Sequence, residues 1–206
     1  MGDLVWYVSY GSNMCADRFR CYLLGGRPPG AARTYPGARD NTPPRADKAV
    51  WLPGGVYFAT ESPVWGGGRA FYGPDLPGRA AARAYLITAE QFSDVSAQEM
   101  YLQPGTDLDL TRLAAVGRLQ MGPGRYETLI SVGLDGAAPM VTFTAPWNAG
   151  DVPLVSPSAV YLRMLGQGLC EAHGWDAPKV AGYLADLPGA RASWTPERIA
   201  SQCLGD

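Results

Sequence analysis

The chain has a single histidine, His173, among its 206 residues, and this scarcity disfavours several classes of enzyme. A Ser–His or Cys–His nucleophile would have to use that one imidazole. His173 lies in Glu171-Ala172-His173-Gly174, where Gly174 predicts a helix end and a histidine in the last turn suits the helix dipole. We therefore expect His173 to cap a helix. Ser12 also lacks the G-x-S-x-G elbow of the α/β-hydrolases, which disfavours a serine hydrolase.

Metal-ligand clusters are missing as well. The chain has four cysteines, and no two of them form a C-x-x-C pair. With one histidine available, the four close ligands of a structural zinc site are difficult to assemble. We therefore expect no metal site and reduced thiols, some of them in the core. The cysteines are Cys15, Cys21, Cys170 and Cys203.

Long apolar runs and a strong excess of one charge are also absent. No segment approaches the length of a membrane span, so we expect no membrane partner. The net charge is -2 and the basic residues are scattered, which gives no indication of nucleic-acid binding.

The N-terminus has no basic stretch followed by a small-residue cleavage site, which predicts a cytoplasmic location. Hydrophobic residues make up 47% of the chain, so residues 1–206 are expected to fold as one globular domain.

The first two thirds of the chain predict short strands separated by turns rich in glycine and proline. Such a pattern favours an antiparallel sheet or barrel. Asp135-Gly136 predicts a hairpin between the last two strands, with a loop longer than two residues. Gly25–Val50 has little periodicity and is expected to be a long loop or insertion. The predicted strands are Leu4–Tyr10, Val56–Thr60, Arg69–Tyr72, Ala82–Ile87, Tyr126–Gly133 and Met140–Thr144.

The last third predicts helices. Ser156-Pro157 is typical of a helix start, and an apolar stripe from Tyr161 to Ala172 follows it. A second helix is expected over Ala177–Leu187, and Thr195-Pro196 predicts the start of a short third helix.

Another helix is predicted in the middle of the chain. Thr88 and Gln91 have the T-x-x-Q spacing of a capping box. Phe92, Val95, Ser96 and Glu99 then follow at i, i+3, i+4 and i+7, so Glu99 would lie at the end of a core-facing stripe. Glu90 and Asp94 fall on other faces. Burial without a cation would raise the pKa of Glu99 toward neutrality, as a general base or acid requires. Alternatively the helix frays near Met100 and Glu99 points into water, because glutamate is seldom buried.

Tyr10-Gly11-Ser12-Asn13 follows the first apolar strand and predicts a sharp turn. Glycine can adopt a positive φ without steric cost, and serine and asparagine side chains bond to nearby backbone. The turn can simply end the strand. It can also direct several backbone N–H groups one way, which makes a site for an anion or a carbonyl oxygen.

Together these segments resemble the γ-glutamylcyclotransferase family, which includes γ-glutamylamine cyclotransferases and AIG2-like proteins. Tyr7–Met14 resembles its Y-F-A-Y-G-S-N-L signature, and the segment ending at Glu99 is similar to the one that carries the family's catalytic glutamate. The similarity follows the family order over almost the whole chain. Further matching segments are Trp65–Gly68, Ala84–Ile87, Tyr126, Pro157–Tyr161 and Gly168–Gly174.

The resemblance implies an α+β fold with a small, mostly antiparallel β-barrel flanked by helices. It implies an enzyme that cyclises a small-molecule γ-glutamyl amide to 5-oxoproline and releases an amine or amino acid. Glu99 would be the general acid and base, and no metal or organic cofactor would be needed. The substrate-binding residues implied are Tyr10, Gly11, Ser12, Asn13, Met14, Tyr126 and Tyr161. Two alternatives are a biosynthetic enzyme acting on a larger or carrier-bound amine and a catalytically silent binding domain.

The chain also departs from the family pattern. Met14 replaces the usual leucine, and no glycine follows Glu99. Gly25–Val50 is longer than in compact members and carries four spread arginines. It is either a solvated insertion or a segment that borders the pocket and selects an acidic leaving group through an arginine. The arginines are Arg27, Arg33, Arg39 and Arg45. The oligomeric state is left open.

Overall fold

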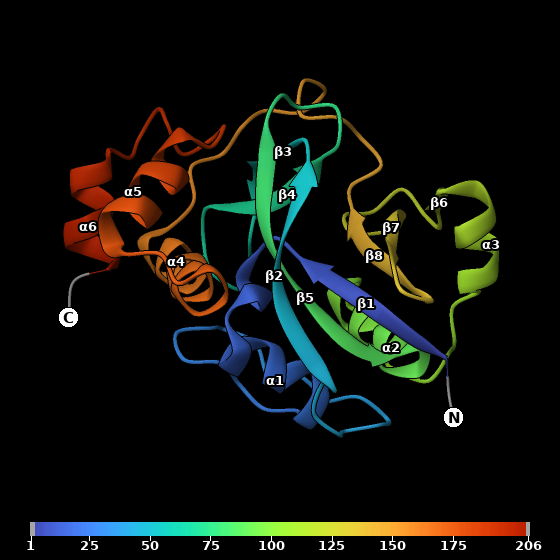
Figure 1. The fold of residues 1–206 in the computed structure, drawn as a ribbon. Helices are drawn as coiled ribbons and strands as arrows, with labels where there is room; N and C mark the ends of the chain where they lie inside the picture. Colours follow the sequence, from blue (N-terminus) through green and yellow to red (C-terminus); the bar gives the residue numbers. More distant parts are fainter. Residues whose placement is uncertain (1–2, 205–206) are drawn as a thin grey trace.

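The computed structural model describes residues 3–204, and its centre is a six-stranded sheet (Figure 1). The strand order is β2-β5-β1-β8-β7-β6. All neighbouring pairs in this sheet are antiparallel except β1–β8, which is parallel. The two remaining strands, β3 and β4, form a separate antiparallel pair. The strands are β1 (Leu4–Ser9), β2 (Ala46–Pro53), β3 (Gly55–Glu61), β4 (Gly68–Gly73), β5 (Arg79–Thr88), β6 (Arg118–Gln120), β7 (Thr128–Asp135) and β8 (Ala138–Thr144).

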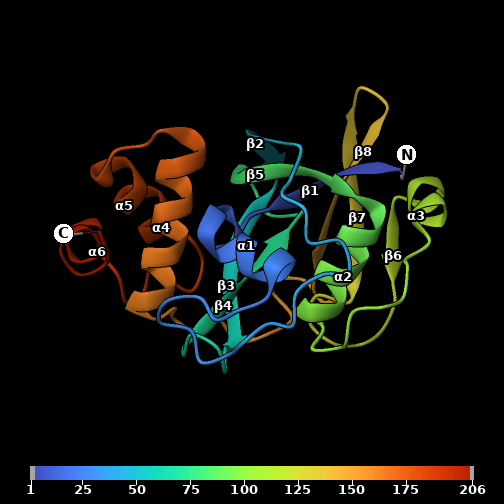
Figure 2. The same ribbon diagram turned by 90° about the horizontal axis from the view of Figure 1, so that it is seen from below.

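The sheet has a hydrophobic core on each face because β1 and β5 alternate their side chains. Trp6 and Val8 pack on one side, with β3, β4 and the C-terminal helices. Val5 and Tyr7 pack on the other side, with the helices that Figure 2 shows in front of the sheet. Alternation at a period of two residues is the normal geometry of a strand buried on both faces.

The α+β class is confirmed, but the expected barrel is wrong, because the sheet is open. Closure would require the edge strands to pair, and within residues 3–204 β2 pairs only with β5 and β6 only with β7. β6 has three residues, and β2 leaves most of its side chains at least partly exposed. A very short edge strand such as β6, and charged residues and a proline such as Asp47, Lys48 and Pro53 of β2, are features that protect a sheet edge from further pairing. After β2 the chain turns at Gly54 into the separate β3–β4 pair instead of extending the sheet.

The predicted helices are present at nearly the expected bounds. Helix α2 (Ala89–Glu99) begins with the predicted capping box, in which Thr88 and Gln91 bond reciprocally. The three C-terminal helices are α4 (Ala159–His173), α5 (Ala177–Asp186) and α6 (Pro196–Cys203). Within residues 3–204, none of the helices has the length and apolar character that crossing a membrane requires.

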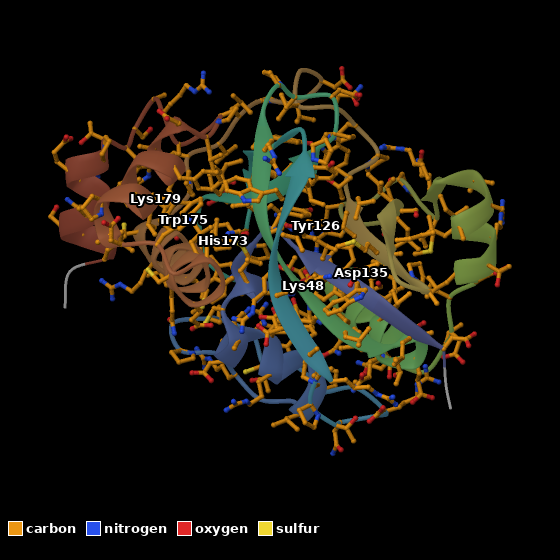
Figure 3. All side chains as sticks on the ribbon, viewed as in Figure 1. Lys48, Tyr126, Asp135, His173, Trp175 and Lys179 are labelled. Atoms are coloured by element: carbon orange, nitrogen blue, oxygen red, sulfur yellow. The ribbon has the colours of Figure 1, made fainter. Side chains whose placement is uncertain are left out.

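Several elements were not anticipated. Residues 46–50 lie in β2 and not in a loop, so the irregular segment between α1 and β2 is shorter than expected. Helices α1 (Ala16–Leu24) and α3 (Leu110–Val116), the 3-10 turn η1 (Ser12–Met14) and β6 were also missed. The Asp135-Gly136 hairpin is confirmed, but its loop has only two residues, since Asp135 pairs with Ala138. Lys48 of β2 forms an ion pair with Asp135 and lies 4.3 Å from the centre of the Trp6 ring (Figure 3).

Candidate active site

The predicted turn after β1 forms one wall of a pocket. Gly11 is extended, with φ -118° and ψ -150°, and the short helix η1 follows it. The positive φ expected for this glycine is therefore not used. A Cβ here would be in ordinary contact with Tyr161 Oη, at 3.5 Å, so only a side chain longer than that of alanine would take up space in the pocket. Gly168 allows η1 to pack closely against α4. A Cβ at this position would lie only 2.5 Å from Met14 Cβ, which is too short for two carbon atoms in contact.

Backbone N–H groups of this turn are free to bind a ligand. The first N–H groups of a helix have no partner within the helix. Among residues 3–204, no protein acceptor is paired with the N–H groups of Gly11, Ser12 or Asn13, whereas those of Met14 and Cys15 bond back to Gly11 and Ser12. These N–H groups can therefore donate hydrogen bonds to an anion or to a polarised carbonyl oxygen.

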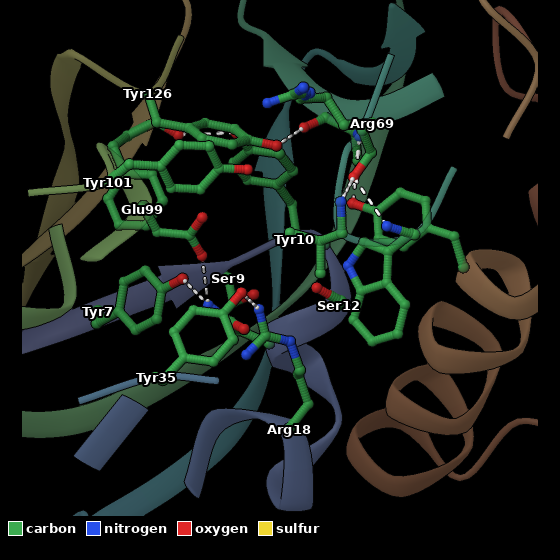
Figure 4. Close-up of a pocket in the computed structure, with 18 residues that line it drawn as sticks. Tyr7, Ser9, Tyr10, Ser12, Arg18, Tyr35, Arg69, Glu99, Tyr101 and Tyr126 are labelled. Atoms are coloured by element: carbon green, nitrogen blue, oxygen red, sulfur yellow. Dashed lines mark hydrogen bonds between the residues drawn. The ribbon is translucent and has the colours of Figure 1, made fainter. Parts of the chain in front are cut away.

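Glu99 is the last residue of α2, and its side chain lies in the same pocket (Figure 4). Its Oε1 accepts a hydrogen bond of 3.0 Å from Asn13 Nδ2 and another from the Tyr22 hydroxyl. The helix does end at Met100, as one alternative expected, but Glu99 turns into the pocket and is only partly exposed. Of the residues that line this pocket, Glu99 is the only carboxylate.

Asp94 lies on a different face of α2 from Glu99, as predicted, but it is the more buried of the two carboxylates. Asp94 accepts bonds from the Arg39 side chain and backbone and from the N–H of Gly105. A buried carboxylate is tolerated where such partners surround it. Asp94 therefore anchors neighbouring loops and does not face the pocket.

Arg18, from α1, is a buried cation beside Glu99 that the sequence analysis did not single out. Its Nη2 donates to the hydroxyls of Tyr22 (2.9 Å) and Tyr35 (2.6 Å). Burial lowers the pKa of Arg18, but Tyr22, Tyr35 and Glu99 together more than reverse this, so the guanidinium stays charged. Its Nε and Nη1 have no partner among the described residues. The signal available in the sequence was the Arg18–Tyr22 spacing, which places both on one face of a helix.

Tyrosines form much of the remaining wall and stay neutral. Burial raises the pKa of Tyr161 to about 12 and raises that of Tyr126 well above its usual value. The Tyr126 hydroxyl donates to the carbonyl of Ala70 (2.8 Å), and the N–H of Ala70 donates to the Tyr161 hydroxyl (3.2 Å). The two tyrosines, one just before β7 and one in α4, thus fix the same residue of β4.

The structure brings together seven of the eight residues proposed from the sequence, and Met14 is the exception. The Met14 side chain is buried under α4, and its carbonyl accepts bonds from Tyr85 and Arg83. The residues brought together are Tyr10, Gly11, Ser12, Asn13, Glu99, Tyr126 and Tyr161. The lining residues that the sequence analysis missed include Tyr7, Arg18, Tyr35, Trp65, Arg69 and Tyr101.

The segment between α1 and β2 borders this pocket, as one of the two alternatives expected, although many of its residues are exposed. Tyr35 lines the pocket directly. Arg33 lies with its Cζ 4.2 Å from the centre of the Tyr101 ring, and Tyr101 is also part of the lining. Arg39 reaches α2 through Asp94. Of the four arginines, Arg33 therefore lies beside the end of α2 that carries Glu99, whereas Arg39 contacts the first turn and the middle of this helix.

His173 lies in the last turn of α4, and Gly174 adopts the left-handed conformation, as expected for a helix end. The imidazole nevertheless contacts the carbonyl of Ala82 in β5, at 3.0 Å from Nε2, instead of the α4 carbonyls.

The four cysteines are free thiols. Within residues 3–204, no three His, Cys, Asp or Glu side chains are grouped as metal ligands would be.

Comparison with known proteins finds a similar sequence and solved structures of similar fold. No family model matches the chain. Histone deacetylase 5 of Arabidopsis thaliana is 33% identical over 200 residues, which cover 87% of this chain and 30% of that protein. The chain thus spans under a third of the length of this relative, and the name histone deacetylase refers to that whole, longer protein.

Two solved structures superimpose over almost the full length of the chain. An uncharacterized human protein has a TM-score of 0.54 and 15% identity, with 98% of this chain and 99% of that chain covered. A gamma-glutamyl cyclotransferase has a TM-score of 0.52 and 15% identity, with 97% of each chain covered. The chain therefore has the gamma-glutamyl cyclotransferase fold, and identities this low establish the fold alone.

Proposed function

We propose that this chain is a γ-glutamylcyclotransferase-type enzyme, which converts a γ-glutamyl amide into 5-oxoproline and a free amine or amino acid. The observation that carries the proposal is the position of Glu99. Its carboxylate faces the same pocket as the free N–H groups that begin η1. A proton acceptor and an anion-binding turn across one small pocket are what this reaction needs.

The reaction joins two groups of the same substrate. The α-amine attacks the γ-carbonyl carbon, a C–N bond forms and closes the five-membered ring, and the original amide C–N bond breaks. An ammonium group cannot attack, so Glu99 removes a proton from the amine and passes it to the departing nitrogen. Because the nucleophile belongs to the substrate, positioning supplies much of the rate and no covalent enzyme intermediate is needed.

The charges in the pocket support this assignment. Asn13 and Tyr22 donate to Glu99 and fix its orientation toward the cavity. The N–H groups of Gly11, Ser12 and Asn13 would bind the substrate α-carboxylate or the developing oxyanion. Arg18, beside Glu99, has two buried donors without a partner and can complete the carboxylate site.

The test is release of 5-oxoproline by the purified protein. A panel of γ-glutamyl amino acids, γ-glutamyl amines and glutathione should include at least one substrate that yields 5-oxoproline and its amine in equal amounts, measured by mass spectrometry. α-Glutamyl-alanine is the control, since attack of its amine on the α-amide would close only a three-membered ring, so 5-oxoproline and alanine cannot be released together. Absence of 5-oxoproline from the whole panel would contradict the proposal.

A further inference from the structure

The carboxylate of Glu99 lies at the end of a helix that does not favour a negative charge. Glu99 is the last residue of α2, and the C-terminal end of a helix is the negative end of its dipole. The last turn of α2 contains no basic residue that would offset this. Within residues 3–204, Glu99 forms no direct ion pair with a lysine, arginine or histidine. The stabilisation of this carboxylate therefore comes from other elements.

Helix α1 supplies a cation that reaches Glu99 through a hydroxyl group. Arg18 is buried, with 2% of the residue exposed, and no carboxylate in the described part of the chain pairs with it directly. Its Nη2 donates to the Tyr22 hydroxyl at 2.9 Å, and this hydroxyl donates to Glu99 Oε1. A buried cation without a counter-charge is costly. The two bonds thus link a cation and a carboxylate that would each be unfavourable alone.

Tyr22 is suited to connect the two charged groups. It is buried, and burial raises the pKa of its hydroxyl well above the usual value, so the hydroxyl keeps its proton and donates to Glu99. The bond from the guanidinium polarises this hydroxyl and strengthens the bond that it donates in turn. Tyr22 is not among the residues that line the pocket. It therefore acts on Glu99 and not on a substrate.

Both bonds to Glu99 fall on the same oxygen atom. Asn13 and Tyr22 donate to Oε1, and no hydrogen bond from the rest of residues 3–204 reaches Oε2. In Figure 4 only one of the two oxygens of Glu99 carries a dashed line. Oε2 is therefore the oxygen left for the substrate. In the proposed reaction the proton of the amine moves to Oε2 and from there to the departing nitrogen.

The irregular segment between α1 and β2 holds the guanidinium in place. The Tyr35 hydroxyl accepts a bond of 2.6 Å from the same Nη2 of Arg18. The ring centres of Tyr22 and Tyr35 lie 4.5 Å and 4.3 Å from Arg18 Cζ, distances at which the rings attract the cation. Two elements thus fix the position from which Arg18 acts.

We propose that Arg18 and Tyr22 form a positioning pair for Glu99, in which Arg18 acts through the Tyr22 hydroxyl to hold Oε1 so that Oε2 faces the reacting amine. The inference rests on the proposed function and adds the means by which its base is held. Arg18 uses Nη2 for this role and keeps Nε and Nη1 for the substrate. Since Tyr22 lies outside the pocket lining, its contribution belongs to turnover and not to substrate binding.

Tyr22→Phe removes the hydroxyl and keeps the ring. We expect kcat for 5-oxoproline release to fall about 10- to 100-fold and KM to change less than about 3-fold, because a misplaced base slows the chemical step without weakening binding. Tyr183→Phe is the matched control. It also removes one hydroxyl, the acceptor for the N–H of Ala81, and Tyr183 does not line the pocket. The control should keep the wild-type kcat and KM. An unchanged kcat in Tyr22→Phe, or an equal fall in both variants, would overturn the inference.

Double variants distinguish positioning from a purely structural role. If Tyr22 acts only through Glu99, Tyr22→Phe should change the residual rate of Glu99→Gln by less than about 2-fold. If Arg18 affects turnover through Tyr22, Arg18→Met should lower the kcat of the wild type far more than that of Tyr22→Phe. Rates are measured at saturating substrate, so weaker binding by Arg18→Met does not enter. Additive losses in either cycle would contradict the pair.

A spectroscopic readout separates this inference from the proposed function. In protein with glutamate isotopically labelled at Cδ, the Glu99 resonance is the one missing from Glu99→Gln. Tyr22→Phe and Arg18→Met should displace this resonance in the same direction at neutral pH, and Tyr183→Phe should leave it in place. That result would support the pair even if the wild type released no 5-oxoproline. A Glu99 resonance that Tyr22→Phe does not move would overturn the inference and leave the proposed function standing.

Discussion

Glu99 and Asp94 show at the scale of single residues how partners, and not helical periodicity, decide the role of a carboxylate. Asp94 is the more buried of the two, but all of its contacts tie loops to α2. Glu99 accepts hydrogen bonds from one side chain of η1 and one of α1, and its carboxylate faces the cavity. Only a group that can reach a substrate can act as its base.

Glu99→Gln should lower turnover about 10²- to 10⁴-fold, because the amide keeps the shape but cannot accept the proton. The measurement is the 5-oxoproline release rate on purified protein with a wild-type unfolding curve. Glu90→Gln is the matched control on the same helix, outside the pocket, and should keep wild-type turnover. Near-normal turnover by the folded Glu99→Gln protein would remove Glu99 from the mechanism.

Gly11→Val should lower kcat/KM far more than Ser12→Ala. The backbone of Gly11 suits any residue, so the expected loss comes from the valine side chain, whose Cβ would lie 3.5 Å from Tyr161 Oη and fill the pocket. Ser12→Ala keeps the backbone N–H groups that are expected to bind the substrate. If Ser12 were a nucleophile instead, Ser12→Ala would abolish activity, and mass spectrometry of the wild type with substrate would detect a covalent adduct.

At the scale of elements, side-chain contacts hold the irregular segment between α1 and β2 against α2. Arg39 bonds to Asp94 through its Nε and its backbone N–H, at 3.1 Å and 2.8 Å. Gln91 donates to the carbonyls of Asp40 and Thr42. The helix that presents Glu99 is thus fixed by a segment with no regular structure of its own, and Tyr35 of the same segment completes the pocket wall.

Arg39→Met should lower the free energy of unfolding by about 1–3 kcal/mol, because it leaves the buried Asp94 without its cation. The effect is smaller than for a fully buried pair, since the Arg39 side chain is one-third exposed. Urea unfolding provides the measurement. Arg45→Met, an exposed arginine of the same segment, should change stability by less than about 0.5 kcal/mol. Equal effects of the two substitutions would show that the Asp94 contact does not stabilise the fold.

The single histidine gives the whole molecule a pH response that can be assigned to one group. His173 joins the end of α4 to β5 through Ala82 and packs beside Trp175, with ring centres 5.1 Å apart (Figure 3). Burial lowers the pKa of His173, and Lys179 lowers it further, against the bond to Ala82. The folded state therefore binds the proton less readily than the unfolded state, and folding stability must rise with pH between the two pKa values.

Stability should fall as the pH is lowered from about 6.5, the value for an unperturbed histidine, toward the lower pKa of the folded state. His173→Gln should flatten this part of the curve, because glutamine keeps an N–H donor for Ala82 and does not titrate. Asp40 and Glu197, whose pKa values are lowered, add their own dependence only at more acidic pH. Urea unfolding of both proteins between pH 5 and 8 provides the comparison, and parallel curves would contradict the assignment to His173.

The sequence by itself determined the features that depend on near neighbours. The capping box at Thr88, the helix end at Gly174 and the turn at Gly136 each need only a few adjacent residues, and all three are present. The turn after β1 and the location of Glu99 at the end of a helix were likewise predictable, because strand and helix periods are local. The α+β class followed from the order of these elements.

Only the tertiary structure decided which residues share the pocket and whether the sheet closes. β1 lies between β5 and β8, and the pairing of Trp6 with Met140 spans most of the chain. Packing of α1, the segment after it, β4 and the residues after α2 around one cavity, and not any local pattern, brings Arg18, Tyr35, Arg69 and Tyr101 around Glu99. The open sheet, the burial of Asp94 and the displacement of Met14 from the pocket also depend on contacts between distant segments. Local propensity carries no information about such contacts, because they form only when the elements pack together.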